Sequence, residues 1–377
     1  MRKVLALVSD AYGGRGGIAL YSRNILYALC RNKHIVEVVA VPRSIAYELE
    51  EMPENLRYLS GAAGGNLRYL ATCVRLAFSK KKVDLIVCGH LHLLPMAYLL
   101  QVVFRCPVVL IVYGVDAWTK TRHRIVNYLC RKLEYFITIR KLTANRFAAL
   151  AGLKDARYYY LPNCIDEKKY GIGPKRTDLM ARYGLEGSRV ILTAGRLDSI
   201  ETEGKKGFDE VLEVLPDLRK EVANIKYLIV GDGDDKARLQ KKAKRLGLDD
   251  IVVFSGYVTE NEKADHYRLA DVFAMPGSDP QFDRYPFRFV FLEALACGVP
   301  VVGCCFEEES EANDPMAQEL IIQVDPNNPM EINKGILKAL SYGRPRINPV
   351  LYELYYIEFE KRVNALLTDI MHIHSSA

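Results

Sequence analysis

A glycine-rich segment follows the first apolar run of the chain, and its residue types suit the binding of a phosphate group. The run 3–9 leads into segment 10–18, in which Gly16 and Gly17 open an amphipathic stretch. Glycines between a strand and a helix let backbone N–H groups approach an anion, which the helix dipole also favours. The spacing departs from the strict dinucleotide-binding pattern, so a flexible turn is the alternative reading.

Two cations occupy a similar place in the second half of the chain. The apolar run 189–194 leads into Gly195 and Arg196, and Lys206 follows ten residues after Arg196. An Arg and a Lys at the mouth of a parallel sheet could clamp a diphosphate, because both donate charge-assisted hydrogen bonds to phosphate oxygens. A solvated loop would also accommodate them, so this segment alone leaves both readings open.

Glu293 stands inside an apolar stretch, 286–297, that has the pattern of a helix. A buried carboxylate costs several kcal/mol unless it is paired or faces a polar ligand. The alternative is a Glu on the helix surface, which its apolar neighbours disfavour. We therefore expect Glu293 to meet a partner or a ligand.

The elements that must position these residues alternate between short β-branched runs and amphipathic stretches. Continuously apolar runs are typical of strands covered on both faces, and alternating strands and helices predict an α/β fold with doubly wound parallel sheets. The expected strands are 3–9, 35–42, 83–88, 107–113, 136–139, 189–194, 226–231, 251–255, 271–275, 300–303 and 319–323. The expected helices include 17–30, 66–79, 208–222, 235–246, 260–269, 286–297 and 351–371.

Length and charge both indicate two domains. The 377 residues exceed the roughly 250–300 that one hydrophobic core supports, and segment 162–178 combines Pro, Gly and charge without apolar periodicity. Residues 1–160 contain 24 Lys and Arg against 10 Asp and Glu, a net charge of +14, whereas the remainder carries −8. A basic half suggests contact with an anionic surface, either nucleic acid or lipid.

The cysteines and the apolar runs restrict the compartment. The nine cysteines form no CxxC pair, and several lie in apolar runs, which indicates buried free thiols in a reducing cytosol. The longest apolar region, 93–115, is interrupted by prolines and polar residues, so it predicts a helix and a strand rather than a membrane span. The N-terminal apolar run is too short for a signal peptide.

The motifs in this order resemble glycosyltransferase family 4, whose members are retaining, sugar-nucleotide-dependent enzymes of the GT-B fold. The resemblance implies two facing Rossmann-like domains. An acceptor-binding domain would span 1–165 with a returning helix at 351–377, and a nucleotide-sugar-binding domain would span 166–350. The motifs that carry the resemblance are Gly16-Gly17-Ile18, Leu161–Asp166, Gly195-Arg196 with Lys206-Gly207, Val230–Gly233, Phe254–Val258 and Glu293–Val302.

The resemblance also implies a role for each matching residue. Arg196 and Lys206 match the pair that holds the donor diphosphate, and Glu293 matches the acceptor of the ribose hydroxyls. Gly16 and Gly17 match the loop that closes over the diphosphate.

Tyr257 and Val258 match the loop beside the nucleobase, and Asp232 lies in the family's glycine turn. Asp232 and Asp234 have the spacing of a metal-binding DxD motif, but they coincide with that turn. The sequence therefore predicts that no metal or other cofactor is required.

The sequence departs from the family pattern at two positions. Tyr285 stands where the family has a Glu near the donor sugar, and Tyr113 stands where it often has a His. A tyrosine hydroxyl can hydrogen-bond a sugar but lacks the basicity of an imidazole at neutral pH. His90, after the preceding strand, is a further candidate contact to the sugar or the acceptor. We count all three with Arg196 and Lys206 as candidate catalytic residues.

These features predict an enzyme that moves a hexose-type sugar from a UDP- or GDP-linked donor to a lipid-linked or oligosaccharide acceptor. The pathway would be the biosynthesis of a bacterial surface polysaccharide: lipopolysaccharide, capsule or exopolysaccharide. Because of Tyr285 and Tyr113, the alternative is a catalytically weak or inactive GT-B protein that acts as a binding partner. We do not expect a nucleic-acid ligand, since the basic half lacks the interleaved aromatic and basic residues of a dedicated nucleic-acid-binding protein.

The basic first half further predicts a cytoplasmic protein bound peripherally to the anionic inner face of the plasma membrane. Segment 66–82 combines an apolar strip (Leu67, Leu70, Val74, Leu76, Phe78) with five cations, and segment 121–146 adds seven. Each Lys or Arg near an anionic bilayer contributes about 1 kcal/mol of binding. A helix that packs on the sheet with a solvated basic face is the alternative for either segment.

Overall fold

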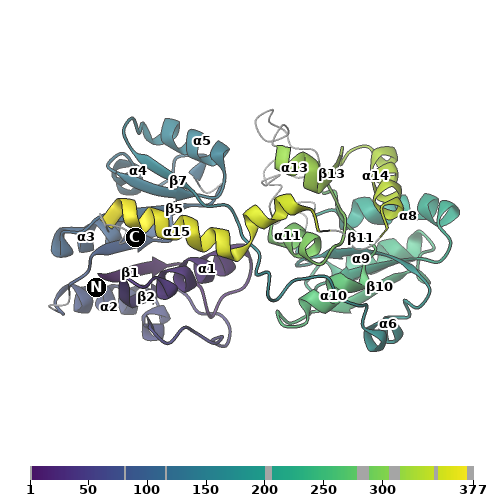
Figure 1. Ribbon diagram of the computed structural model, residues 1–377, viewed down its shortest axis with the longest axis horizontal. Helices are drawn as coiled ribbons and strands as arrows, with labels where there is room; N and C mark the ends of the chain where they lie inside the picture. The colour runs from purple at the N-terminus through teal and green to yellow at the C-terminus, as the bar shows by residue number, and fades with distance from the viewer. Residues whose placement is uncertain are drawn as a thin grey trace. The chain divides into compact units, whose positions relative to one another are not determined.

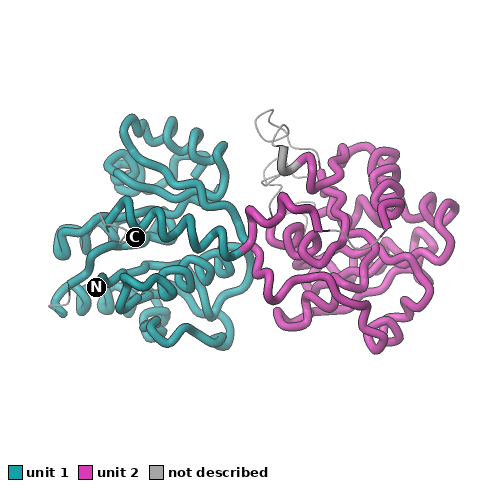
Figure 2. The backbone as a smooth tube through the Cα atoms, in the orientation of Figure 1, with its two compact units in different colours: residues 1–164, 356–377 teal, residues 165–355 magenta. Residues whose placement is uncertain are grey.

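The chain folds into two compact units, seen in a computed structural model that describes residues 2–79, 82–114, 117–199, 206–277, 288–304, 315–343 and 347–371. Unit 1 comprises Met1–Cys164 and Tyr356–Ala377, and unit 2 comprises Ile165–Tyr355 (Figure 2). This division differs slightly from the expected 1–165 and 166–350. Residues 351–355, expected in the returning helix, belong to unit 2, where the backbone N–H of Ile165 donates to the carbonyl oxygen of Leu354 at 2.8 Å.

Unit 1 is built on a parallel sheet with the strand order β3-β2-β1-β4-β5-β6-β7 (Figure 1). The order reverses at β1, so the carboxyl ends of β1 and β4 lie side by side, as at a topological switch point. The strands are β1 (Arg2–Val8), β2 (Ile35–Pro42), β3 (Leu56–Tyr58), β4 (Leu85–Cys88), β5 (Val108–Val112), β6 (Tyr135–Thr138) and β7 (Arg157–Tyr160).

Helices cover both faces of this sheet. Leu5 and Leu7 of β1 share a core cluster with α2 (Asn66–Ala77), α3 (Leu94–Phe104), α4 (Arg124–Cys130) and α5 (Lys141–Ala151). The intervening residues Val4 and Ala6 are also buried, and alternate strand side chains point to opposite faces. The other face is covered by α1 (Gly17–Arg31) and α15 (Tyr356–Met371), which pack against each other.

Unit 2 contains a second parallel sheet, with the strand order β10-β9-β8-β11-β12-β13. Its strands are β8 (Arg189–Ala194), β9 (Ile225–Val230), β10 (Val252–Gly256), β11 (Val272–Met275), β12 (Val301–Cys304) and β13 (Ile321–Val324). One face is covered by α8 (Phe208–Glu221), α9 (Lys236–Arg245) and α14 (Pro329–Ser341), whose apolar residues form one cluster with the strands. The remaining described helices are α6 (Thr177–Tyr183), α10 (Lys263–Leu269), α11 (Phe289–Ala296) and α13 (Pro315–Leu320).

The predicted pair of parallel sheets is confirmed, although two strands and the helices α6, α13 and α14 were not predicted, and one expected helix is divided. Strands β3 and β7 lie at the edges of their sheet and are only partly buried, so they lack a continuous apolar run. The helix expected over 351–371 is a 3₁₀ helix at Pro349–Leu354 followed by α15. Region 93–115 supplies α3 and β5 as expected.

Two further expectations, on the cysteines and on membrane-spanning segments, can be checked in the described residues. The eight cysteines found there are free and buried, as their apolar context predicts; the ninth, Cys305, lies outside the described residues. Among the helices of the described ranges, none is both long and apolar enough to cross a membrane.

Candidate functional site

Arg196 and Lys206 are brought together at the carboxyl end of β8. Arg196 Nε lies 3.3 Å and Lys206 Nζ 3.4 Å from the same oxygen, Oδ2 of Asp198. Lys206 Nζ also donates to the carbonyl oxygen of Arg196 at 3.2 Å. The Arg196 side chain is 64% exposed and presents its charge to solvent, whereas the Lys206 side chain is 19% exposed and largely covered.

Backbone hydrogen bonds join the loop after β8 to the loop after β9. The N–H of Gly195 donates to the carbonyl oxygen of Val230 at 2.9 Å, and the N–H of Leu197 donates to that of Asp232 at 3.0 Å. The two chains approach so closely that a Cβ at Gly231 would lie 1.9 Å from the carbonyl oxygen of Gly195. Gly231 also has a φ of +146°, which side chains rarely adopt. The glycine turn therefore holds the Arg196 backbone in place.

The amino terminus of α8 points to the same edge of the sheet. Gly207 precedes α8 with a φ of +100°, and a Cβ there would lie 2.8 Å from the backbone nitrogens of Pro276 and Gly277, just after β11. The first turn of α8 thus begins beside Lys206, between the ends of β8 and β11. A helix amino terminus next to two cations favours a phosphate.

Asp232 is engaged within its own turn. Its Oδ1 accepts from the N–H of Gly233 at 3.1 Å and lies 3.3 Å from Lys236 Nζ. Across the described residues, no cluster of three or more His, Cys, Asp or Glu side chains is arranged to hold a metal ion.

Tyr257 and Val258 follow β10, beside the same glycine turn. The N–H of Gly231 donates to the carbonyl oxygen of Gly256 at 3.0 Å, which ties the two loops together. Tyr257 is 53% exposed, whereas Val258 is 7% exposed. An exposed aromatic ring at this edge is suited to stack on a nucleobase.

Glu293 is buried in α11, and each of its carboxylate oxygens has a hydrogen-bond donor within unit 2. Its carboxylate is 2% exposed and accepts hydrogen bonds from the hydroxyls of Tyr170 at 3.0 Å and Tyr267 at 2.6 Å. Lys263 Nζ lies 3.9 Å from Oε1 and 2.5 Å from Glu260. The structure therefore supplies the partners that a buried carboxylate requires, and the ribose contact of Glu293 stays a prediction.

In unit 1 the glycine segment lies at the carboxyl end of β1, ahead of α1. Gly16 and Gly17 are exposed, and Gly16 has a φ of +90° with no described atom within 4 Å of a Cβ built there. No side chain caps α1 within the described part of unit 1. The first N–H groups of α1 are thus placed where an anion could reach them.

His90 follows β4, which pairs with β1, and Tyr113 follows β5, the strand on the far side of β4. His90 is half-buried, its Nδ1 accepts from the N–H of His92 at 3.2 Å, and burial lowers the pKa of its imidazole below the usual range. The Tyr113 ring packs edge-on against Tyr21 of α1, and its hydroxyl is buried. The contact of Tyr113 with a sugar stays a prediction.

Sequence reasoning overlooked three residues that now belong to the site. Asp198 bridges the two expected phosphate ligands, and its place two residues after Arg196 was the available signal. Tyr170 and Tyr267 hold Glu293, but neither lies in a motif that marks such a role. Tyr285, a candidate from the sequence, falls outside the described residues.

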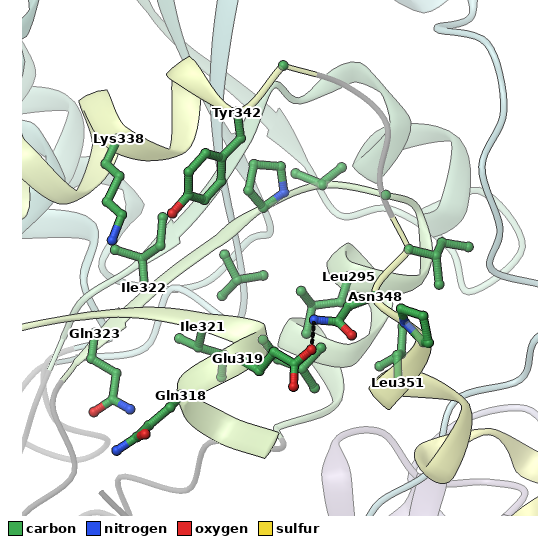
Figure 3. A pocket seen from close by; sticks show the side chains of 18 residues that line it. Leu295, Gln318, Glu319, Ile321, Ile322, Gln323, Lys338, Tyr342, Asn348 and Leu351 are labelled. Carbon is green, nitrogen blue, oxygen red and sulfur yellow. Dashed lines mark hydrogen bonds between the residues drawn. The ribbon is translucent and has the colours of Figure 1, made fainter. Parts of the chain in front are cut away.

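A pocket of about 740 Å³ in unit 2 lies at the opposite edge of the sheet (Figure 3). It is lined at the amino ends of β12 and β13 and by Lys338 and Tyr342 from the end of α14. Inside it, Asn348 donates from its side chain to Glu319 at 3.0 Å. Among the predicted site residues that the structure describes, none lines this pocket.

Both halves of the chain match models of sugar-transferring families. Residues 15–169 match the family described as Glycosyltransferase Family 4, and residues 175–348 match Glycosyl transferases group 1. A GDP-mannose-dependent alpha-(1-6)-phosphatidylinositol monomannoside mannosyltransferase of Mycolicibacterium smegmatis is 35% identical over 167 residues. That match covers 44% of this chain and 42% of the relative, less than half the relative's length. An uncharacterized glycosyltransferase of Methanocaldococcus jannaschii is 24% identical over 89% of both chains.

Solved structures match the fold along nearly the whole chain. HepE of Anabaena, solved in complex with UDP, superposes with a TM-score of 0.72 over 98% of this chain and all of HepE, at 18% identity. The lipopolysaccharide outer core galactosyltransferase WaaB superposes with a TM-score of 0.68 over 97% of this chain and 99% of WaaB, at 14% identity. At these identities the likeness establishes the fold alone.

Proposed function

The chain belongs to glycosyltransferase family 4, and on that premise we propose that it transfers a hexose-type sugar, with retention of anomeric configuration, from a nucleotide sugar to an acceptor. Unit 2 binds the donor through its nucleoside diphosphate. The acceptor, lipid-linked or an oligosaccharide, is bound by unit 1.

One observation carries this proposal: the convergence of Arg196 and Lys206 on Asp198 at the mouth of the unit 2 sheet. Two cations 3.3 and 3.4 Å from one carboxylate oxygen are spaced to hold an anionic group between them. The amino terminus of α8 adds partial positive charge at the same place. A donor diphosphate would replace the carboxylate as the partner of both cations.

The chemistry follows from that placement. The bond between the anomeric carbon and the donor phosphate oxygen breaks, and the acceptor oxygen forms a bond to that carbon on the same face. The acceptor proton passes to the leaving diphosphate, which therefore serves as the base. Arg196 and Lys206 stabilise the charge that develops on the diphosphate, and a cation pair can do this without a metal.

The substrates are proposed by class. The donor carries UDP or GDP, and the mannosyl- and galactosyltransferases among the relatives support a hexose. The acceptor belongs to bacterial surface-polysaccharide assembly, a place suggested by the fold shared with a lipopolysaccharide galactosyltransferase. No metal or other cofactor takes part.

A donor panel tests the proposal. Purified protein is incubated with UDP- and GDP-linked hexoses, and free nucleoside diphosphate is measured with and without lipid-linked or oligosaccharide acceptors. Release above the uncatalysed rate with one donor supports the proposal. Tight nucleotide binding without release from any donor would favour the alternative, a GT-B protein acting as a binding partner.

We further propose that unit 1 attaches to an anionic membrane through α2, α3 and α4. Helix α3 packs against both α2 and α4, so their outer surfaces adjoin. These surfaces expose large apolar side chains beyond what a solvated helix needs. The most exposed are Leu67 and Phe78 (82% each), Val102 (76%), Ile125 (61%), Tyr128 (57%) and Leu99 (52%).

Cations border these apolar side chains. On α2 the core face is formed by Tyr69, Cys73 and Leu76, so the apolar strip expected there faces solvent except for Leu76. The bordering cations are Arg68, Arg75, Arg105, Arg124, Arg131 and Lys132, all exposed.

Several cations expected at this surface are not part of it. Lys141 and Arg146 lie on α5, and Lys80 and Lys81 fall outside the described residues. Arg140 is buried, and its guanidinium carbon lies 5.4 Å from the centre of the Trp118 ring. The remaining arrangement, apolar side chains ringed by cations, suits the headgroup region of an anionic bilayer. A cytoplasmic location at the inner face of the plasma membrane follows from this attachment.

A further inference from the structure

Two tyrosines hold the Glu293 carboxylate from its two oxygens. The Tyr170 hydroxyl donates to Oε1 at 3.0 Å, and the Tyr267 hydroxyl donates to Oε2 at 2.6 Å. Because each oxygen has its own donor, the plane of the carboxylate is set as well as its position. A side chain that only needed compensation for burial could be satisfied in many orientations, whereas this one is restricted to one.

The three groups come from separate parts of unit 2. Tyr170 follows a turn in which its backbone N–H donates to the carbonyl oxygen of Asp166 at 2.9 Å. Tyr267 lies on α10 and Glu293 on α11, and these helices pack against each other. Burial and the nearby carboxylate raise the pKa of both tyrosines, so they are protonated donors at neutral pH.

We propose that Tyr170 and Tyr267 are positioning residues for the nucleotide, which hold Glu293 so that its remaining lone pairs accept the ribose hydroxyls. This inference rests on the proposed function, in which Glu293 meets the ribose. An ionised carboxylate offers about four acceptor sites, and the tyrosines use two of them. Lys263 Nζ, 3.9 Å from Oε1, is beyond hydrogen-bond distance, so the other two sites accept no hydrogen bond from a described residue. Because the carboxylate is 2% exposed, the ribose reaches these sites only when the side chains around them shift.

A purely structural role makes a different prediction. If the tyrosines only stabilised the packing of α10 on α11, their loss would affect every nucleotide alike. If they position Glu293, their loss would affect only ligands that carry ribose hydroxyls. The ribose hydroxyls themselves therefore provide the readout.

The experiment titrates the whole protein with GDP, UDP and their 2′,3′-dideoxy counterparts by calorimetry. The variants are Tyr170→Phe and Tyr267→Phe, which keep the rings. The matched control is Tyr183→Phe, because the Tyr183 hydroxyl meets His266 Nε2 of α10 at 3.1 Å and does not touch Glu293. We expect the unchanged protein to bind the ribonucleotide more tightly than the dideoxynucleotide. Each of the two variants should lose roughly tenfold in affinity for the ribonucleotide only.

Each other outcome has a defined meaning. Equal losses for both kinds of nucleotide, or no loss for either, would overturn the positioning role. If the unchanged protein binds ribonucleotides and dideoxynucleotides equally well, Glu293 does not contact the ribose, and this inference is wrong. Binding of neither nucleotide would overturn the proposed function itself. Glu293→Gln keeps both tyrosines and should abolish the preference for ribose, which supports the inference even where a tyrosine variant folds poorly.

Discussion

Lys206 Nζ donates to the carbonyl oxygen of Arg196 at 3.2 Å, although the two residues are ten positions apart in the chain. The contact closes the loop between β8 and α8 at its ends and brings both side chains to Asp198. The positive charge at this edge of the sheet is therefore assembled before any ligand arrives. Preorganised charge of this kind does not have to be rearranged during the reaction.

Removal of either cation should slow sugar transfer strongly. We expect Arg196→Ala and Lys206→Ala each to lower turnover at least a hundredfold, since such a group typically contributes about 2–4 kcal/mol of transition-state stabilisation. Steady-state transfer assays with the preferred donor measure this. Arg219→Ala is the matched control, because Arg219 forms an exposed ion pair with Asp250 elsewhere in unit 2. Near-normal transfer by both variants would contradict the proposal that Arg196 and Lys206 bind the donor diphosphate.

Glu293→Gln should weaken nucleotide binding more than it slows the chemical step. A carboxylate accepts charge-assisted hydrogen bonds from ribose hydroxyls, which an amide replaces poorly. Calorimetric titration with the free nucleoside diphosphate gives the affinity, and turnover at saturating donor gives the rate. An unchanged affinity would contradict the ribose contact.

Gly231→Ala should destabilise unit 2. The added Cβ would meet the carbonyl oxygen of Gly195 at 1.9 Å, at a φ of +146°. Backbone strain and overpacking each cost about 1–3 kcal/mol, so the melting temperature should fall by several degrees. Gly184→Ala separates the two effects, because Gly184 has a φ of +60° but open space around it. Similar melting temperatures of the two variants would show that the close approach of the two loops at Gly231 adds little to the loss of stability.

Stability should decline as the pH falls below about 6.5, in part through His266. Burial lowers the pKa of His266 from 6.5, so the unfolded chain binds its proton more readily than the folded one. The free energy of unfolding therefore decreases from pH 6.5 down to the lowered pKa and is unaffected by this residue at higher pH. Urea midpoints between pH 5 and pH 8 provide the measurement. Replacement of His266 by Gln should reduce the fall of the urea midpoint below pH 6.5. An unchanged fall would exclude His266 as its source.

Membrane attachment should require both the cations and the apolar side chains of α2. Co-sedimentation with anionic vesicles should exceed that with neutral vesicles and should fall as salt rises, because the attraction is screened. Reversal of charge at Arg68 and Arg75, or polar replacement of Leu67 and Phe78, should each reduce pelleting, whereas reversal at Arg219 should not. Equal pelleting with both kinds of vesicle, or none with either, rules out this mechanism.

The alternation of apolar runs and amphipathic stretches was sufficient to predict both parallel sheets. Strands covered on both faces need continuous apolar sequence, and runs such as 189–194 form β8 with the predicted bounds. The edge strands β3 and β7 were not predicted, because a strand with one solvated side can carry polar residues such as Arg57 and Arg157. The pattern reports burial, so it fails where burial is incomplete.

The residue types after the predicted strand 189–194 likewise singled out Arg196 and Lys206, and the apolar helix pattern around Glu293 singled out that carboxylate as one that needs a partner. Only the tertiary structure brought Asp198 between the two cations and placed Tyr170 and Tyr267 on the two oxygens of Glu293. Strand ends are defined by local sequence, since the run that forms the strand also ends there. Contacts between α10, α11 and the segment around Tyr170 depend on how separate elements pack, and no local pattern encodes that.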